Sequence, residues 1–277
     1  MLRLITGDWE GRLEELLERG DRRHVRRERV EAIIRDVRRR GDEALLEYTR
    51  MFDGVSFRRA ADIGVGPEEM EEAAARVSPA FLEAVRRAAE RIEQFHSRQR
   101  ESSWWSVGAS GLVTGQVYRP LESVGLYVPG GAAAYPSSLL MTAIPARVAG
   151  VGRIAVFTPP GPSGRPDLHL LAAAHVLGRL EVYALGGVQA VAAAAYGTST
   201  VKRVDKIVGP GNTWVTEAKR QVYGVVGIDM LAGPSEVAVV ADGGADPGLI
   251  AADLLAQAEH DAEAGIFLVT TEEEIPG

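Results

Sequence analysis

Three glycine-rich turns and one short polar run are the segments of this chain whose residue types and spacing could do chemistry. The turns are Pro129-Gly130-Gly131, Gly186-Gly187-Val188-Gln189 and Gly209-Pro210-Gly211-Asn212. Each turn follows an apolar segment with strand character and precedes a segment with helical character. Glycine at such a place lets backbone N–H groups approach a phosphate at the positive end of a helix dipole. The three turns therefore predict a nucleotide-binding site.

The polar run is Gln257-Ala258-Glu259-His260-Asp261. Gln257 and His260 are three residues apart, so on a helix they would share one face. Neutral imidazole is a good zinc ligand and an amide oxygen is a weak one, so these two residues alone cannot complete a four-coordinate site. A structural histidine is the alternative, but the neighbouring Glu259 and Asp261 favour a metal or acid–base site with further ligands from elsewhere.

Several of these positions also have a purely structural interpretation. Asn212 can cap the helix that its turn opens. Tyr127 is either a core aromatic residue or a ring that stacks on a ligand at the carboxyl end of its strand. Ser235, which follows a glycine between two strand-like segments, is either a turn residue or a ligand contact. No segment has the pattern G-x-G-x-x-G, so the usual dinucleotide fingerprint is absent.

The chain has three lysines, Lys202, Lys206 and Lys219, and all lie near the turn at residues 209–212. Arginine supplies the rest of the positive side-chain charge. This clustering is either a chance result of an arginine-rich composition or a sign of positions where a guanidinium group cannot replace an ammonium group.

The elements that must position these residues alternate in type from about residue 120 onward. Predicted strands lie at 124–128, 153–157, 180–185 and 206–208, and predicted helices at 137–149, 168–177, 189–196 and 213–222. Apolar strands that alternate with helices form parallel sheets through right-handed crossovers. We therefore expect a Rossmann-like dinucleotide-binding domain at residues 120–235.

The rest of the chain predicts a second α/β domain. Residues 1–119 have mostly helical periodicity, with an arginine-rich amphipathic helix at 22–40 and irregular or β structure at 102–117. A strand at 237–240, a helix at 247–260 and a strand at 266–270 follow the Rossmann-like domain. The expected fold class is α/β: a Rossmann-like parallel-sheet domain plus a second α/β domain with a helical N-terminal segment, built from residues 1–119 and completed by 236–277.

Composition excludes several classes of protein. The length of 277 residues is comfortable for two domains. The lack of cysteine excludes disulfides and thiolate ligands, and no apolar run approaches the roughly 18–20 residues that cross a bilayer. The net charge of −7 argues against nucleic acid as a partner. With no secretory signal at the start, these features predict a cytoplasmic enzyme that acts on a small molecule, without a membrane or nucleic-acid partner.

Taken together, the motifs resemble histidinol dehydrogenase in their order and spacing. The blocks that carry the resemblance lie at residues 127–131, 135–138, 144–146, 186–189, 195–198, 204–206, 209–212, 228–230, 232–236 and 257–260. The match covers about residues 120–270, and the N-terminal third fits only in helical character. The resemblance implies a zinc-containing enzyme that oxidises L-histidinol to L-histidine through the aldehyde with two NAD, in the last steps of histidine biosynthesis. It also implies a homodimer with shared active sites.

The resemblance assigns roles to single residues. The implied NAD contacts are Tyr127, Gln189 and Asn212. Ser235, Gln257 and His260 would contact the substrate, and Gln257 and His260 would also bind zinc. The family's catalytic Glu-His pair and remaining zinc ligands would lie beyond Gly277. We therefore expect a C-terminally truncated chain that has no catalytic residue of its own and is inactive alone.

Two alternatives remain at this stage. One is a paralogous NAD-dependent dehydrogenase of another polar alcohol, although the block at residues 135–138 favours histidinol. The other is a truncated, non-catalytic nucleotide-binding remnant. The sequence of the natural gene downstream of Gly277 would separate the remnant from the two enzymes.

Overall fold

The computed structural model describes residue 11 and residues 20–130, 135–231, 236–259 and 264–271. Its internal contacts divide the chain into two compact units. One unit is Arg29–Leu231, and the other combines Met1–Glu28 with Ala232–Gly277. The mixed α/β architecture that the sequence predicts is confirmed, and each unit is described below by itself.

A sheet whose described strands are six in number forms the centre of the unit at Arg29–Leu231, in the order β1-β6-β5-β4-β7-β8. The parallel strands are β4 (Ser123–Tyr127), β5 (Arg153–Thr158), β6 (Glu181–Ala184), β7 (Lys206–Val208) and β8 (Gly227–Ile228). β1 (Gly64–Val65) adds an antiparallel edge. β4 is buried at every position, because helices cover both faces of a parallel sheet. The predicted strands are thus confirmed to within one or two residues, whereas β1 and β8 were not predicted.

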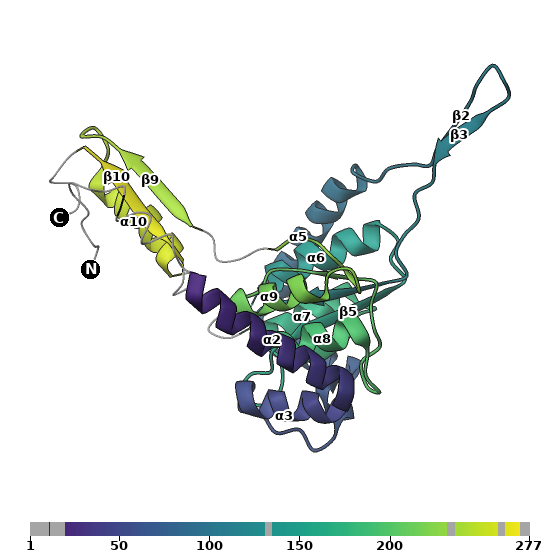
Figure 1. Cartoon of the computed structure of the whole chain (residues 1–277), viewed down its shortest axis with the longest axis horizontal. Helices are drawn as coiled ribbons and strands as arrows, with labels where there is room; N and C mark the ends of the chain where they lie inside the picture. Colours follow the sequence, from purple (N-terminus) through teal and green to yellow (C-terminus); the bar gives the residue numbers. More distant parts are fainter. Residues whose placement is uncertain (1–10, 12–19, 131–134, 232–235, 260–263, 272–277) are drawn as a thin grey trace. The chain divides into compact units, whose positions relative to one another are not determined.

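Helices follow the strands of this sheet, as expected for right-handed crossovers. They are α6 (Pro136–Val148), α7 (Leu168–Leu177), α8 (Gly187–Tyr196) and α9 (Thr213–Val222). Among the described residues, the helices that precede the central strands are α2 (Gly20–Arg40), α3 (Asp42–Asp53), α4 (Pro67–Arg76) and α5 (Pro79–Ser97), with a short 3-10 helix η1 (Ala60–Ile63). α3 packs on α8, α4 on α7, and α5 on α6 (Figure 1). Residues 29–97 therefore cover the Rossmann-like sheet.

This packing bears on the domain division. The contacts join residues 29–119 to the sheet, because β1 extends the sheet and α3, α4 and α5 bury their apolar faces on its helices. The boundaries expected from the sequence differ, since they place 1–119 together with 236–277 and leave 120–235 as a separate domain. The domain boundaries expected from the sequence therefore remain a prediction.

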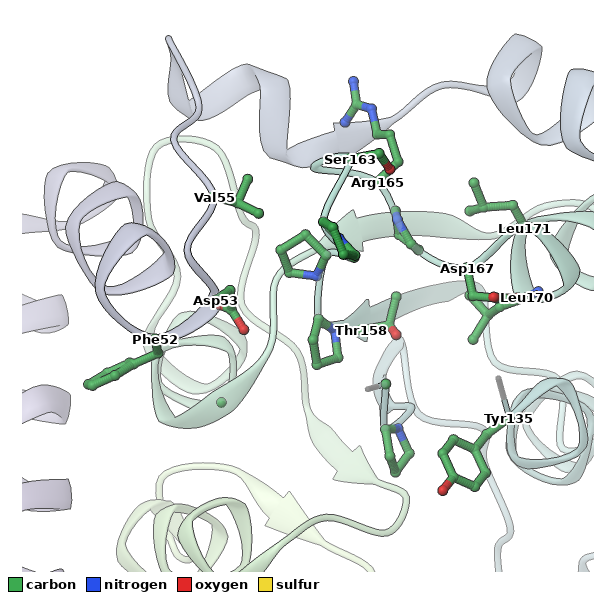
Figure 2. Close-up of a pocket in the computed structure, with 18 of the residues that line it drawn as sticks. Phe52, Asp53, Val55, Tyr135, Thr158, Ser163, Arg165, Asp167, Leu170 and Leu171 are labelled. Atoms are coloured by element: carbon green, nitrogen blue, oxygen red, sulfur yellow. Dashed lines mark hydrogen bonds between the residues drawn. The ribbon is translucent and has the colours of Figure 1, made fainter. Parts of the chain in front are cut away.

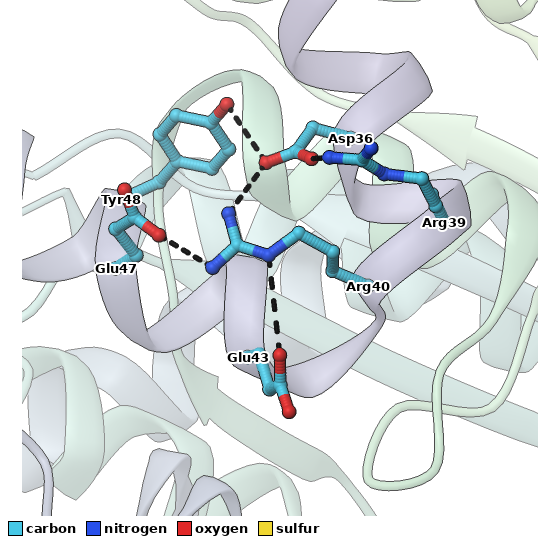
Figure 3. Close-up of polar contacts among 6 residues, drawn as sticks. All are labelled: Asp36, Arg39, Arg40, Glu43, Glu47 and Tyr48. Carbon is cyan, nitrogen blue, oxygen red and sulfur yellow. Dashed lines mark hydrogen bonds and ion pairs between the residues drawn. The ribbon is translucent and has the colours of Figure 1, made fainter.

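A network of ion pairs fixes the corner between α2 and α3 (Figure 3). The Arg40 guanidinium binds the carboxylates of Asp36, at 2.9 Å, and of Glu47. The Tyr48 hydroxyl donates a hydrogen bond to Asp36 at 3.2 Å. Hydrogen bonds from Arg39 and Arg40 hold the pKa of the Asp36 carboxyl below its usual value. The network sets the direction of α3, whose last residue reaches the pocket described below.

Residues 102–117, expected to be irregular or β, contain the antiparallel hairpin of β2 (Trp104–Val107) and β3 (Val113–Gln116). The hairpin extends away from the sheet (Figure 1), and the side chains of Trp104 and Trp105 are 51% and 65% exposed.

The other unit contains a β-α-β segment. β9 (Val237–Ala241) pairs in parallel with β10 (Ile266–Thr270), and α10 (Pro247–Ala258) lies between them in sequence. α10 begins with Asp246, whose carboxylate accepts the Gly248 N–H at 2.7 Å, and with proline at the first helical position. Among the described helices of the whole chain, none is both long and apolar enough to cross a membrane.

Candidate functional site

A pocket of about 1530 Å³ opens in the unit at Arg29–Leu231, around the carboxyl ends of the parallel strands. Its walls come from the ends of β4 and β5, the starts of α8 and α9, the end of α3, and α4. Figure 2 shows Phe52 and Asp53 on one side, Leu170 and Leu171 on the other, and the loop that carries Ser163 between them. Small-molecule sites usually measure roughly 300–1,000 Å³. The pocket is thus large enough for a dinucleotide.

The strand order explains why a pocket forms here. From β4 the chain runs through β5 and β6 to one side of the sheet, and then returns to place β7 and β8 on the other side. The crossovers therefore diverge between β4 and β7, which leaves a crevice at the carboxyl ends of these two strands. Tyr127 is the last residue of β4, and the turn at residues 209–212 directly follows β7.

Tyr127 lines this pocket, although it is only 4% exposed. Its hydroxyl oxygen accepts the backbone N–H of Gly187 at 3.1 Å, which fixes the first turn of α8 to the end of β4. Burial raises the pKa of Tyr127 to about 12, so the phenol stays neutral at physiological pH. Of the two interpretations left open by the sequence, the structure shows a largely core aromatic residue with one polar contact at the pocket wall.

Gln189 is completely buried in α8 and also lines the pocket. Its amide nitrogen donates a long hydrogen bond of 3.5 Å to the Asp53 carboxylate. Its Oε1 atom is buried and has no hydrogen-bond partner among the described residues. A buried acceptor without a donor costs about 1–3 kcal/mol. An unsatisfied acceptor therefore lies beneath the pocket wall, withdrawn from solvent in the ligand-free protein.

Asp53 is a pocket residue that the sequence reasoning missed. It is the last residue of α3, and burial raises the pKa of its carboxyl from 3.8 to about 6. A signal was present, because an acidic residue at the C-terminal end of a helix is disfavoured by the helix dipole and so calls for another explanation. Its proximity to Gln189 could not be seen in the sequence, since 136 residues separate the two.

Asn212 caps α9, as the sequence predicted. Its side-chain oxygen accepts the N–H groups of Trp214 and Val215, each at 3.1 Å. The residue is exposed and lines the pocket together with Trp214. Asn212 thus places the positive end of α9 at the pocket wall.

Close packing of two loops shapes the wall between β4 and α8. A Cβ atom on Gly186 would lie 2.5 Å from Cγ of Pro159, so no larger residue fits without displacing the loop that follows β5. The glycine turn at 186–189 therefore serves at least partly to bring the start of α8 against this loop.

The structure brings Tyr127, Gln189 and Asn212 together in one pocket. Gln257 is half-buried in the last turn of α10, in the other unit. Ser235 and His260 lie outside the described residues. Among residues 11, 20–130, 135–231, 236–259 and 264–271 no group of three or more His, Cys, Asp or Glu could hold a metal ion. The described residues therefore do not supply a zinc site.

Comparisons with known proteins extend the resemblance to nearly the whole chain. A sequence model of the histidinol dehydrogenase family matches residues 18–276, so the match includes the N-terminal third. The chain is 51% identical to histidinol dehydrogenase from Listeria innocua over 246 residues, which are 89% of this chain and 57% of the relative. It is 53% identical to the enzyme from Moorella thermoacetica over 274 residues, which are 98% of this chain and 63% of the relative.

A solved structure agrees with this result. The crystal structure of histidinol dehydrogenase from Elizabethkingia anophelis matches with a TM-score of 0.77 and 42% sequence identity, over 89% of this chain and 57% of that chain. The chain thus spans less than two thirds of the length of these relatives. On the family match, the sequence identities and the shared fold, the chain belongs to the histidinol dehydrogenase family.

Proposed function

We propose that this chain is the nucleotide-binding part of an enzyme that oxidises L-histidinol to L-histidine through the aldehyde, in the last steps of histidine biosynthesis. The observation that carries the proposal is the pocket at the β4–β7 crevice, because it contains all three residues that the family resemblance assigns to NAD. NAD held in this pocket would supply the hydride acceptor for each of two oxidations, alcohol to aldehyde and, after water has added to the aldehyde, hydrate to acid.

The residues of the pocket suit a dinucleotide. The N-terminus of α9 at Asn212 favours the negative charge of phosphate groups. The buried Oε1 of Gln189 offers an acceptor to a donor group of the cofactor. Tyr127 holds the start of α8 in place and keeps its neutral phenol at the wall.

The substrate side of the site rests on the other unit. We propose that Ser235, Gln257 and His260 contact the amino alcohol, and that Gln257 and His260 contribute to a zinc site. Because the described residues do not make up a zinc site, no step of the reaction is assigned to the metal. We further propose a cytoplasmic homodimer with shared active sites, without a membrane or nucleic-acid partner. The general base and the remaining ligands would come from sequence downstream of that found in this chain.

The chain covers 57–63% of the length of these two relatives, and the assay below distinguishes a non-catalytic nucleotide-binding remnant from an enzyme. A dehydrogenase of another polar alcohol would differ in the substrate it accepts and can be tested in the same assay.

The assay uses histidinol, NAD and added zinc, and follows NADH formation. We expect the chain alone to be inactive, since loss of a general base costs on the order of 10²–10⁴ in rate. A chimera in which the chain is followed by the remaining C-terminal part of the Moorella thermoacetica relative should oxidise histidinol. An inactive chimera that still folds would contradict the proposed reaction, and full activity of the chain alone would contradict the assignment of roles.

A further inference from the structure

Lys219 and Asp229 hold Gly209, which lies three residues before the pocket residue Asn212, from both sides. The Lys219 ammonium donates a hydrogen bond to the Gly209 carbonyl at 3.0 Å and forms an ion pair with Oδ1 of Asp229. The other carboxylate oxygen of Asp229 accepts the Gly209 N–H at 2.7 Å. Both backbone polar groups of Gly209 are thus bonded to one ion pair, which we call the clamp.

The burial of the clamp indicates that the ion pair has a specific role. The Lys219 side chain is 2% exposed and the Asp229 side chain is 31% exposed. Removing a charge from water is costly, and a buried ion pair is often no more stable than apolar residues of the same size. A compact ammonium group with several donors can serve a carbonyl and a carboxylate in different directions, whereas a planar guanidinium has a fixed fork. The use of lysine in an arginine-rich chain fits this geometry.

Gly209 connects the two sides of the crevice. Its φ angle is +115°, and a Cβ atom on it would lie 2.1 Å from the carbonyl oxygen of Tyr127. Gly209 therefore packs directly on the end of β4, and only Pro210 and Gly211 separate it from Asn212. Holding Gly209 in place fixes the position of Asn212 relative to Tyr127.

We infer that Lys219 and Asp229 are positioning residues for the nucleotide pocket: the clamp holds the turn at residues 209–212 in the conformation that binds the cofactor. The inference rests on the proposed role of the pocket in binding NAD. Neither Lys219 nor Asp229 lines the pocket, so the clamp acts on the cofactor through Gly209 and Asn212.

Two variants separate positioning from stability. Lys219→Met leaves the Asp229 carboxylate without its partner, so it should lower both stability and NAD affinity. The double variant Lys219→Met with Asp229→Leu removes both charges and should regain part of the stability, but not the part that the contacts to Gly209 supply. Arg220→Gln is the matched control, because Arg220 pairs on the surface of the same helix with Glu217, away from the turn.

Two readouts decide the inference. Hydrogen–deuterium exchange without NAD should become faster at residues 209–215 in both clamp variants, and stay as in the wild type in the control. The Kd for NAD of the folded double variant should rise by about tenfold or more, since charge-assisted hydrogen bonds that order the turn are lost. Unchanged exchange in the clamp variants would overturn the inference even if the wild type failed to bind NAD, which would contradict the proposed function separately. Faster exchange with unchanged NAD affinity would reduce the clamp to a structural role and also overturn it.

Discussion

Two polar side chains at the pocket wall, Gln189 and Asp53, are withdrawn from water. Gln189 Oε1 is buried without a donor among the described residues, and Asp53 carries a carboxyl group in a poorly hydrated position beside it. The unsatisfied Gln189 oxygen and the buried Asp53 carboxyl both lower the stability of the ligand-free protein. Such an arrangement is typical of a binding site, where the ligand supplies the missing groups.

The carboxyl group of Asp53 should make stability depend on pH. Its pKa is about 6 in the folded protein, against 3.8 for an ordinary aspartate, because burial disfavours the charged form. The protonated form is therefore favoured by the fold, and its stabilising contribution is complete below about pH 4 and is lost as pH rises through about 6. Asp53→Asn lacks this titrating group. The melting temperature of the variant, relative to that of the wild type, should therefore increase as pH rises from about 4 to about 6.

Thermal unfolding of the wild type and of Asp53→Asn across this pH range checks the prediction. Glu72→Gln, an exposed carboxyl at the pocket wall, is the control and should follow the wild-type profile. A difference between wild type and Asp53→Asn that stays constant with pH would show that the Asp53 carboxyl titrates normally.

At the level of elements, local signals in the sequence were sufficient for most boundaries. α7 at Leu168–Leu177 and β7 at Lys206–Val208 agree with the predicted ranges, because apolar periodicity and capping residues are local features. β1 and β8 have two residues each, which is too short for any periodicity. The clamp of Lys219 and Asp229 and the contact of Gln189 with Asp53 depend on tertiary packing, so composition and spacing could not reveal them.

The placement of the pocket residues was predictable for a topological reason. Tyr127, Gln189 and Asn212 each follow a different strand, and the carboxyl ends of parallel strands meet at one edge of a sheet. Their proposed role in NAD binding remains a prediction. The predicted partners Ser235 and His260 lie outside the described residues, so their placement also remains a prediction.

Two substitutions of Asn212 distinguish its structural role, as the N-cap of α9, from its proposed role in binding NAD. Asn212→Ala should lower the free energy of unfolding by about 0.5–2 kcal/mol through loss of the cap, and it should also weaken NAD binding. Asn212→Asp keeps a good cap but places a negative charge beside the phosphates, so it should weaken NAD binding with little loss of stability.

Chemical denaturation and calorimetric titration measure the two effects. Ser78→Ala is the control, because Ser78 caps α5 by accepting the Phe81 N–H at 3.2 Å and does not line the pocket. It should cost similar stability and leave NAD affinity unchanged. Equal NAD affinity of Asn212→Asp and wild type would argue that α9 does not face the phosphates.

At the scale of the whole molecule, we propose that the unit at Arg29–Leu231 binds the nucleotide and that the other unit carries the substrate and metal residues. All described residues assigned to NAD lie in Arg29–Leu231, whereas Gln257 lies in the other unit. The relatives are longer than this chain, and the proposed reaction needs residues that their additional length would supply. Binding of NAD, in contrast, should need only the unit at Arg29–Leu231, which contains both the pocket and the clamp.

Calorimetric titration of the 277-residue chain with NAD tests this central claim most directly. We predict saturable binding with one NAD per chain, and a Kd about tenfold or more higher for Gln189→Met, which keeps the volume but removes the buried acceptor. The same substitution should not lower the stability of the ligand-free chain by much, since it also removes an unsatisfied polar atom. Absence of binding by the folded wild type, or equal binding by Gln189→Met, would contradict the assignment of this pocket to NAD.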